Sequence, residues 1–161
     1  MLSFVDPTVR PKGCIGTGDL TNKLTAEDLF KSVSRCVKQG KNKEGALLLA
    51  MAGTYGWFDM LRVSDTSARS AFIALNMGVF SRMTPEQKKT FEETVEKNVR
   101  SPEGLAATCN EIKRIGPPDY IPRYMIEHGK ALKNADDWLV KDFNADQVWK
   151  QSLQSYLHCA N

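Results

Sequence analysis

The segment from Glu44 to Asp65, EGALLLAMAGTYGWFDMLRVSD, constrains the fold more than any other part of the chain. Every residue from Ala46 to Ala52 is apolar, and mostly small and aromatic residues follow them. A helix that is apolar on all sides must be enclosed by other elements. We therefore expect a central helix here, surrounded by the amphipathic segments that flank it in the sequence.

Length and composition are those of one ordinary globular domain. The chain has 161 residues, of which 42% are apolar and 25% charged, so it can bury a core and does not have the composition of a disordered chain. Its 22 basic and 19 acidic residues leave a net charge of +3, which is too even for a nucleic-acid-binding surface. The longest apolar run is far below the roughly 20 residues that cross a bilayer. We therefore expect no nucleic-acid partner and no transmembrane segment.

Helix-start and helix-stop signals divide the chain into an irregular N-terminal arm, residues 1–24, and a helical domain, residues 25–161. Thr25 opens the sequence TAED, in which a hydroxyl N-cap and a carboxylate three residues later form a capping box. The run Gly116-Pro117-Pro118 stops a helix, because proline lacks the amide hydrogen that a helix interior requires. Further start signals lie at Thr84-Pro85, Ser101-Pro102 and Asn144. The pattern predicts an all-α fold, a single antiparallel bundle of about six or seven helices.

The first expected helix and the central one should form a helical hairpin. Residues 29–56, LFKSVSRCVKQGKNKEGALLLAMAGTYG, resemble one tetratricopeptide-type or Sel1-type unit, with small residues where the helices would pack closely. Tetratricopeptide arrays repeat their unit every ~34 residues, and this chain has no second copy at that period. We therefore expect a single hairpin rather than a solenoid.

The cysteines are widely spaced and include no CxxC pair; they are Cys14, Cys36, Cys109 and Cys159. This spacing suits disulfides better than structural zinc, whose ligands usually come in closely spaced pairs. Four unrelated free thiols are the alternative. Cys36 and Cys109 both lie on the apolar faces of their expected helices, so we predict a Cys36–Cys109 disulfide from among the possible pairings.

Signals for the cellular compartment point in two directions. The N-terminus, MLSFVDPTVRPKG, lacks the basic start and the apolar core of a signal peptide, which favours the cytoplasm. Disulfides, by contrast, form in oxidising compartments. We expect a periplasmic protein whose signal peptide has been removed, with the cytoplasm as the second choice.

No residue pattern predicts catalysis, a metal site or a cofactor. His158 adjoins Cys159, but neighbours on a helix point about 100° apart and cannot form a nucleophile–base pair. Asp59 and Arg62 have the i,i+3 spacing of an ion pair, and we expect this pair to hold the hairpin to the third helix. The expectation is therefore a protein without enzymatic activity.

The loop from Asp119 to Tyr124, DYIPRY, has the composition of a protein-contact surface. Tyrosine and arginine dominate interface hot spots, and prolines lower the entropy cost of presenting them. The alternative is a rigid connector whose tyrosines cover the edge of the core. We predict that the loop binds a partner, through Asp119, Tyr120, Arg123 and Tyr124. The charged helix around residues 92–97 is the next candidate surface.

Taken together, the chain resembles the small helical immunity proteins that Gram-negative bacteria keep beside toxic effectors of type VI secretion. The resemblance rests on LFKSVSRCVKQGK, ALLLAMAGTYGWFDMLRV, GPPDYIPRYMIEHG and the terminal SYLHC, and covers about residues 25–160. Proteins of this class are exported to the periplasm, where they block a cell-wall-degrading or lipid-degrading enzyme. The resemblance implies a protein that neutralises a cognate effector enzyme by protein–protein contact, without catalysis.

A second class of function stays open from the sequence. A small helical enzyme or ligand carrier could line a pocket with the aromatic residues Trp57, Phe58 and Tyr120. Because no nucleophile and base are paired in the sequence, the binding protein is favoured over the enzyme.

Overall fold

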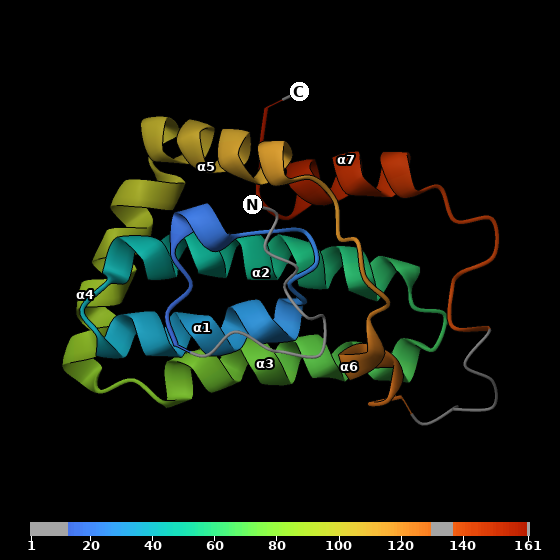
Figure 1. Ribbon diagram of the computed structural model, residues 1–161, viewed down its shortest axis with the longest axis horizontal. Helices are drawn as coiled ribbons and strands as arrows, with labels where there is room; N and C mark the ends of the chain where they lie inside the picture. The colour runs from blue at the N-terminus through green and yellow to red at the C-terminus, as the bar shows by residue number, and fades with distance from the viewer. Residues whose placement is uncertain (1–12, 130–136, 161) are drawn as a thin grey trace, which may run out of the picture.

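The computed structural model describes residues 13–129 and 137–160 of the chain (Figure 1). Within these ranges the regular structure is helical, apart from an isolated β-bridge between Val63 and Leu139. The α-helices are α1 (Ala26–Lys38), α2 (Asn42–Arg62), α3 (Ser70–Ser81), α4 (Pro85–Val95), α5 (Pro102–Ile115), α6 (Arg123–Ile126) and α7 (Ala145–Ser155). The predicted all-α bundle is confirmed. No helix of the described residues is long and apolar enough to cross a membrane.

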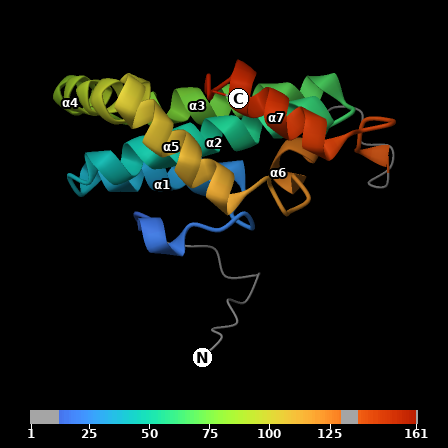
Figure 2. The same cartoon turned by 90° about the horizontal axis from the view of Figure 1, so that it is seen from above.

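The helix α2 is the centre of the fold, as its composition predicts. It runs between α1 and α3 on one side and α5 and α7 on the other, and it contacts α1, α3, α4 and α7 (Figures 1 and 2). Met51, Ala52 and Tyr55 are fully buried in it. The hairpin with α1 is the most extensive helix pair, and the segment after Gly56 continues α2 as helix to Arg62.

The predicted helix starts are found where local chemistry places them. Thr25 and Asp28 form the capping box of α1, and Gly40 follows the helix with a φ of +73°, a conformation that glycine adopts without strain. Side-chain oxygens cap three later helices at their first turns: Thr84 for α4, Ser101 for α5 and Asn144 for α7. These caps depend only on residues close in sequence, which is why the sequence predicts them.

Two connections are less regular than the pattern predicts. The third helix begins with a 3₁₀ turn, Thr66–Arg69, capped by Asp65. The helix α4 passes into a π-helical turn, η3 (Glu96–Arg100), before Ser101 starts α5. A Cβ at Gly104 would lie 2.5 Å from the backbone of Asn98, so α5 folds back closely against this turn.

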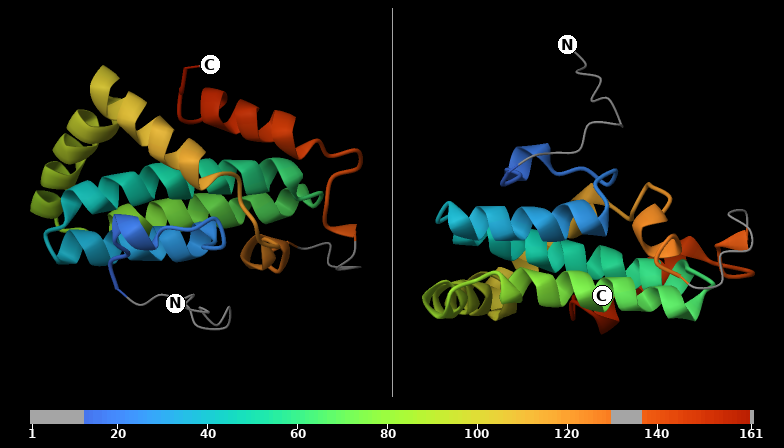
Figure 3. Two further views of the ribbon diagram at one scale, coloured as in Figure 1. Left: turned by 45° about the horizontal axis from the view of Figure 1, so that its top comes forward. Right: turned by 90° about the horizontal axis from the view of Figure 1, so that it is seen from below.

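The described part of the N-terminal arm, residues 13–24, is packed against α1 rather than free of it (Figure 3). It is irregular, as predicted, with one short 3₁₀ turn, Thr17–Asp19. Ile15, Leu20 and Leu24 are buried, and the Ile15 amide donates a 2.8 Å hydrogen bond to Ser32 Oγ. This segment therefore contributes to the core.

The predicted Cys36–Cys109 disulfide is wrong, although both cysteines are buried as expected. The bonds are Cys14–Cys36, with a Cα separation of 4.6 Å, and Cys109–Cys159, with 5.8 Å. The reason is that α1 and α5 lie on opposite sides of α2 (Figure 1). Each helix instead receives a terminal segment: α1 the N-terminal arm and α5 the C-terminal one.

Candidate functional site

A buried carboxylate, Asp59, organises the end of α2 that faces the loop 119–124. Its side chain is fully buried, and its Oδ1 accepts a 2.9 Å hydrogen bond from Arg62 Nε and lies 2.8 Å from Arg62 Nη2. Its Oδ2 accepts hydrogen bonds from the hydroxyls of Tyr120 (2.8 Å) and Tyr124 (2.5 Å). The predicted ion pair is confirmed, but it joins the hairpin to this loop rather than to the third helix.

Arg62 extends the same cluster to the backbone and to aromatic rings. Its Nη2 donates a 2.9 Å hydrogen bond to the Tyr120 carbonyl oxygen. Its guanidinium carbon lies 5.0, 5.2 and 5.5 Å from the ring centres of Phe58, Tyr120 and Trp138, within cation–π range. One arginine therefore holds the loop 119–124 and the segment around Trp138 to the end of α2.

The electrostatics of the cluster follow from its burial. Burial raises the pKa of Asp59 above its ordinary value, although the Arg62 charge and the hydrogen bonds from the two tyrosines act in the opposite direction. Burial and the nearby Asp59 carboxyl raise the pKa values of Tyr120 and Tyr124 well above the ordinary tyrosine value. Asp59 is shielded from solvent and its two oxygens accept from three side chains, so the geometry suits anchoring rather than proton exchange with a substrate.

Further contacts hold the loop from three other directions. Tyr120 Oη also accepts from the amide of Ala26 at the start of α1 (3.2 Å), and the Tyr55 hydroxyl donates to the Gly116 carbonyl oxygen (2.6 Å). The Asp119 amide donates to the Asn22 carbonyl oxygen at 2.8 Å. The Asp119 side chain forms an exposed 2.6 Å ion pair with Lys23. The backbone of the loop is thus fixed by the arm, α1 and α2 together.

The predicted contact residues divide into two groups. Tyr120 and Tyr124 are partly buried, with their hydroxyls directed inward to Asp59. Asp119 and Arg123 are exposed. Ile121, which the sequence prediction did not include, is 49% exposed between the two tyrosines. The sequence shows Ile121 as the aliphatic residue before Pro122 in a polar loop, but it does not show whether this side chain is buried or exposed.

Two of the three aromatic residues of the alternative hypothesis, Phe58 and Tyr120, share a contact with the Arg62 guanidinium, whereas Trp57 has other neighbours. Phe58 is buried against Phe143 and Trp149, whereas Trp57 stacks on Tyr156 with ring centres 5.7 Å apart. Tyr120 belongs to the Asp59 cluster. None of the three lines either of two pockets that lie beside α2 in the described part of the molecule.

Those two pockets are neighbours along α2, because Leu49, Val95 and Arg100 line both, and together they are called the groove. The first, about 470 Å³, lies between α2, the end of α3 and α4–η3. The second, about 520 Å³, extends from η3 to the C-terminal residues 156–158. The groove was not predicted from the sequence, since it depends on how η3 and the C-terminal segment meet α2.

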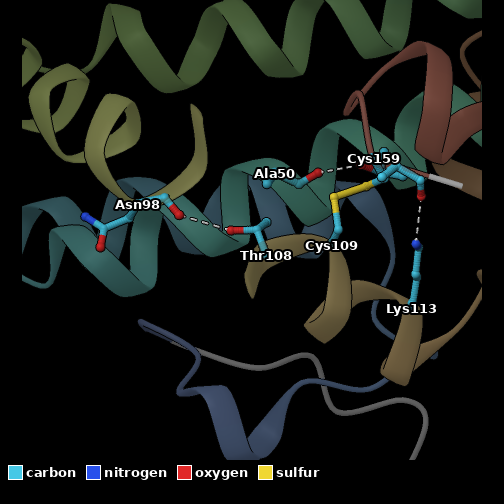
Figure 4. The surroundings of a disulfide bond; sticks show 8 residues. Ala50, Asn98, Thr108, Cys109, Lys113 and Cys159 are labelled. Carbon is cyan, nitrogen blue, oxygen red and sulfur yellow. Dashed lines mark hydrogen bonds between the residues drawn. A yellow bond between two sulfur atoms is a disulfide. The ribbon is translucent and has the colours of Figure 1, made fainter. Parts of the chain in front are cut away.

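The C-terminal segment that borders the groove is held by the Cys109–Cys159 bond (Figure 4). The Lys113 ammonium also donates to the Ala160 carbonyl oxygen at 3.1 Å. The helix α7 ends at Ser155, so His158 and Cys159 lie beyond it. Because Cys159 is bonded to Cys109, this His–Cys neighbour pair contains no thiol nucleophile.

Comparisons of the chain with protein-family models, with curated proteins and with solved structures found no match.

Proposed function

We propose that the protein is a binding protein that neutralises a partner enzyme by contact, as an immunity or inhibitor protein does for a secreted antibacterial effector. The observation that carries this proposal is the division of the loop 119–124. Its tyrosine hydroxyls are bonded to the buried Asp59, whereas Ile121 and Arg123 face solvent. The loop thus displays an apolar and a basic side chain from one fixed backbone.

Such pre-organisation favours binding because association otherwise includes the loss of loop and side-chain freedom. An apolar or arginine side chain at the centre of an interface can contribute about 2 kcal/mol or more when it is truncated. The contact surface proposed here, called the loop surface, consists of Asp119, Ile121 and Arg123. The complementary site that we expect on the partner enzyme is an apolar hollow with an acidic group beside it.

A second exposed apolar residue lies at the same end of α2. Leu139 is 42% exposed and bridges to Val63, directly after Arg62. The amide of Val140 donates to the Arg62 carbonyl oxygen at 2.9 Å, so this segment shares its support with the loop. A partner seated on the loop surface could extend its contact to Leu139.

The compartment proposed for this activity is the periplasm. Two disulfides join the termini to the helical core, and such bonds persist in oxidising compartments. This location suits a protein that meets a secreted enzyme after its delivery.

The proposal is tested by capture followed by an activity measurement. The tagged protein is used to isolate partners from native cells, and the hydrolase that it retains is purified. We expect a stoichiometric complex in which the hydrolase loses its activity at an equimolar ratio. The variant Ile121→Asp with Arg123→Ala serves as the matched control and should restore activity. A captured hydrolase that stays fully active in a saturated complex contradicts the proposal.

A further inference from the structure

We propose that the second pocket of the groove, between α2, η3 and the C-terminal segment, binds a single-chain aliphatic carboxylate, the chemistry of a fatty acid. Its volume of about 520 Å³ lies in the range of small-molecule sites. Its lining comes from α2, α4–η3, α5 and residues 156–158, and includes no residue of the loop surface. The inference therefore does not depend on the proposed protein-contact function.

The pocket offers an apolar bed for an alkyl chain. Seven of the ten lining residues are aliphatic, and the larger ones are Leu49, Val95, Val99, Leu105 and Leu157. Leu49 and Leu105 remain partly exposed, although they lie beside residues of the buried core. An alkyl chain in the pocket would remove this apolar surface from water, which is the main driving force for binding such a ligand.

The remaining three lining residues, Arg100, Tyr156 and His158, can each donate a hydrogen bond. Of the ten described residues that line this pocket, Arg100 carries the permanent charge and none is acidic. Burial raises the pKa of Tyr156, and the positive charge of Arg100 acts against that rise. These donors favour an anionic head group over a neutral or cationic one.

The positions of the acidic residues indicate which end of the pocket the carboxylate of the ligand occupies. The neighbouring pocket is lined by three acidic residues, Glu92, Glu93 and Glu96, against the two basic residues Lys89 and Arg100, so its charged lining is net negative and disfavours an anion. Glu96 accepts one hydrogen bond from Arg100, in a pair whose side chains are 61% and 67% exposed. An arginine has five N–H donors, so this bond leaves capacity for a ligand. The carboxylate is therefore placed at the side of Tyr156 and His158.

Residues 156–158, which form the last side of the pocket, are held in place without a ligand. Residues 156–158 precede Cys159, whose bond to Cys109 ties them to α5 (Figure 4). The Cys159 amide donates to the Leu153 carbonyl oxygen at 2.9 Å, and Tyr156 sits directly over Gly53 of α2. A pre-formed wall avoids the ordering cost that a free C-terminal segment would add to binding.

The test uses sodium dodecanoate below its critical micelle concentration, with binding followed by calorimetry and by tryptophan fluorescence. Trp57 stacks on Tyr156 and is the expected reporter, which the variant Trp57→Phe checks. Dodecanol and dodecyltrimethylammonium share the alkyl chain but are neutral and cationic. The variants are Arg100→Gln, the matched control Arg114→Gln and Leu49→Glu. Arg114 is an exposed arginine that pairs with Glu111 outside the pocket, and Leu49→Glu places a negative charge in the apolar bed.

We expect saturable one-to-one binding of dodecanoate, about tenfold weaker binding of dodecanol and none of the ammonium compound. Arg100→Gln should weaken dodecanoate binding about tenfold, whereas Arg114→Gln should leave it unchanged. Absence of saturable dodecanoate binding overturns the proposal, and so does equal binding of dodecanol together with an unaffected Arg100→Gln variant. If Leu49→Glu does not fold, the ligand series and Arg100→Gln still decide the question.

Discussion

The hydroxyl of Tyr120 donates a 2.8 Å hydrogen bond to Oδ2 of Asp59, 61 residues earlier in the chain. This bond joins the loop 119–124 to the central helix at a point shielded from solvent. The tyrosines of the loop therefore anchor it, whereas the side chains of their neighbours Ile121 and Arg123 are exposed to solvent.

Asp59→Asn should destabilise the fold by about 3–5 kcal/mol, because Arg62 would then be a buried charge without its partner. The free energy of unfolding in urea measures the loss. Asp119→Asn is the matched control: its pair with Lys23 is exposed, with side-chain accessibilities of 63% and 71%. Removing such a pair should cost between 0 and about 1 kcal/mol. Equal effects of the two substitutions would mean that Asp59 does not anchor the loop.

The tyrosines should resist ionisation in the folded protein. All four of them, Tyr55, Tyr120, Tyr124 and Tyr156, have pKa values raised above the ordinary value by burial. An unfolded tyrosine has a pKa of about 10, and the folded pKa values lie above it. The stability that this difference contributes is fully present below about pH 10, and it is lost as the pH rises from there through the folded pKa values. Phenolate absorbance should therefore appear together with loss of the helical circular-dichroism signal. A tyrosine that titrates near pH 10 in an intact fold would contradict this assignment.

Two helical glycines provide a matched test of packing. A Cβ at Gly53 would lie 2.1 Å from the Tyr156 hydroxyl oxygen, whereas a Cβ at Gly78 meets nothing within 4 Å. Gly53→Ala should destabilise the protein by about 1–3 kcal/mol through overpacking. Gly78→Ala should stabilise α3 by up to about 1 kcal/mol. Urea unfolding measures both. A neutral Gly53→Ala would show that Tyr156 does not pack over α2.

The disulfide pairing can be mapped directly. Proteolysis without reductant, followed by mass spectrometry, should give a peptide pair joined through Cys14 and Cys36 and another through Cys109 and Cys159. Reduction should lower the free energy of unfolding by about 3–4 kcal/mol per bond in the chain-entropy model, given sequence separations of 22 and 50. A peptide pair containing Cys36 and Cys109 would contradict the packing of both terminal segments.

The sequence predicts most of the helices but few of the contacts between them. Thr25, Thr84, Ser101 and Asn144 cap helices through residues only a few positions away, so short-range chemistry specifies the starts. The apolar run in α2 likewise predicts its burial. Both signals act within one element, which makes them visible without a structure.

The disulfide pairing and the orientation of the loop depend on which faces meet across the molecule. Cys36 and Cys109 are both buried helix residues, yet α2 lies between their helices, α1 and α5. The composition of the loop does not show that the hydroxyls of Tyr120 and Tyr124 point inward and donate hydrogen bonds to Asp59. Apolar periodicity tells which side of a helix is buried, but not which segment covers it.

Contact through the loop surface is tested by the double variant Ile121→Asp with Arg123→Ala. Calorimetry measures its affinity for the captured hydrolase, and the melting temperature is recorded beside it. We expect binding to weaken by about tenfold or more, with the melting temperature changed by no more than about 2 °C. An unchanged affinity would exclude the loop surface from the interface and make the charged surface around residues 92–97 the next to test.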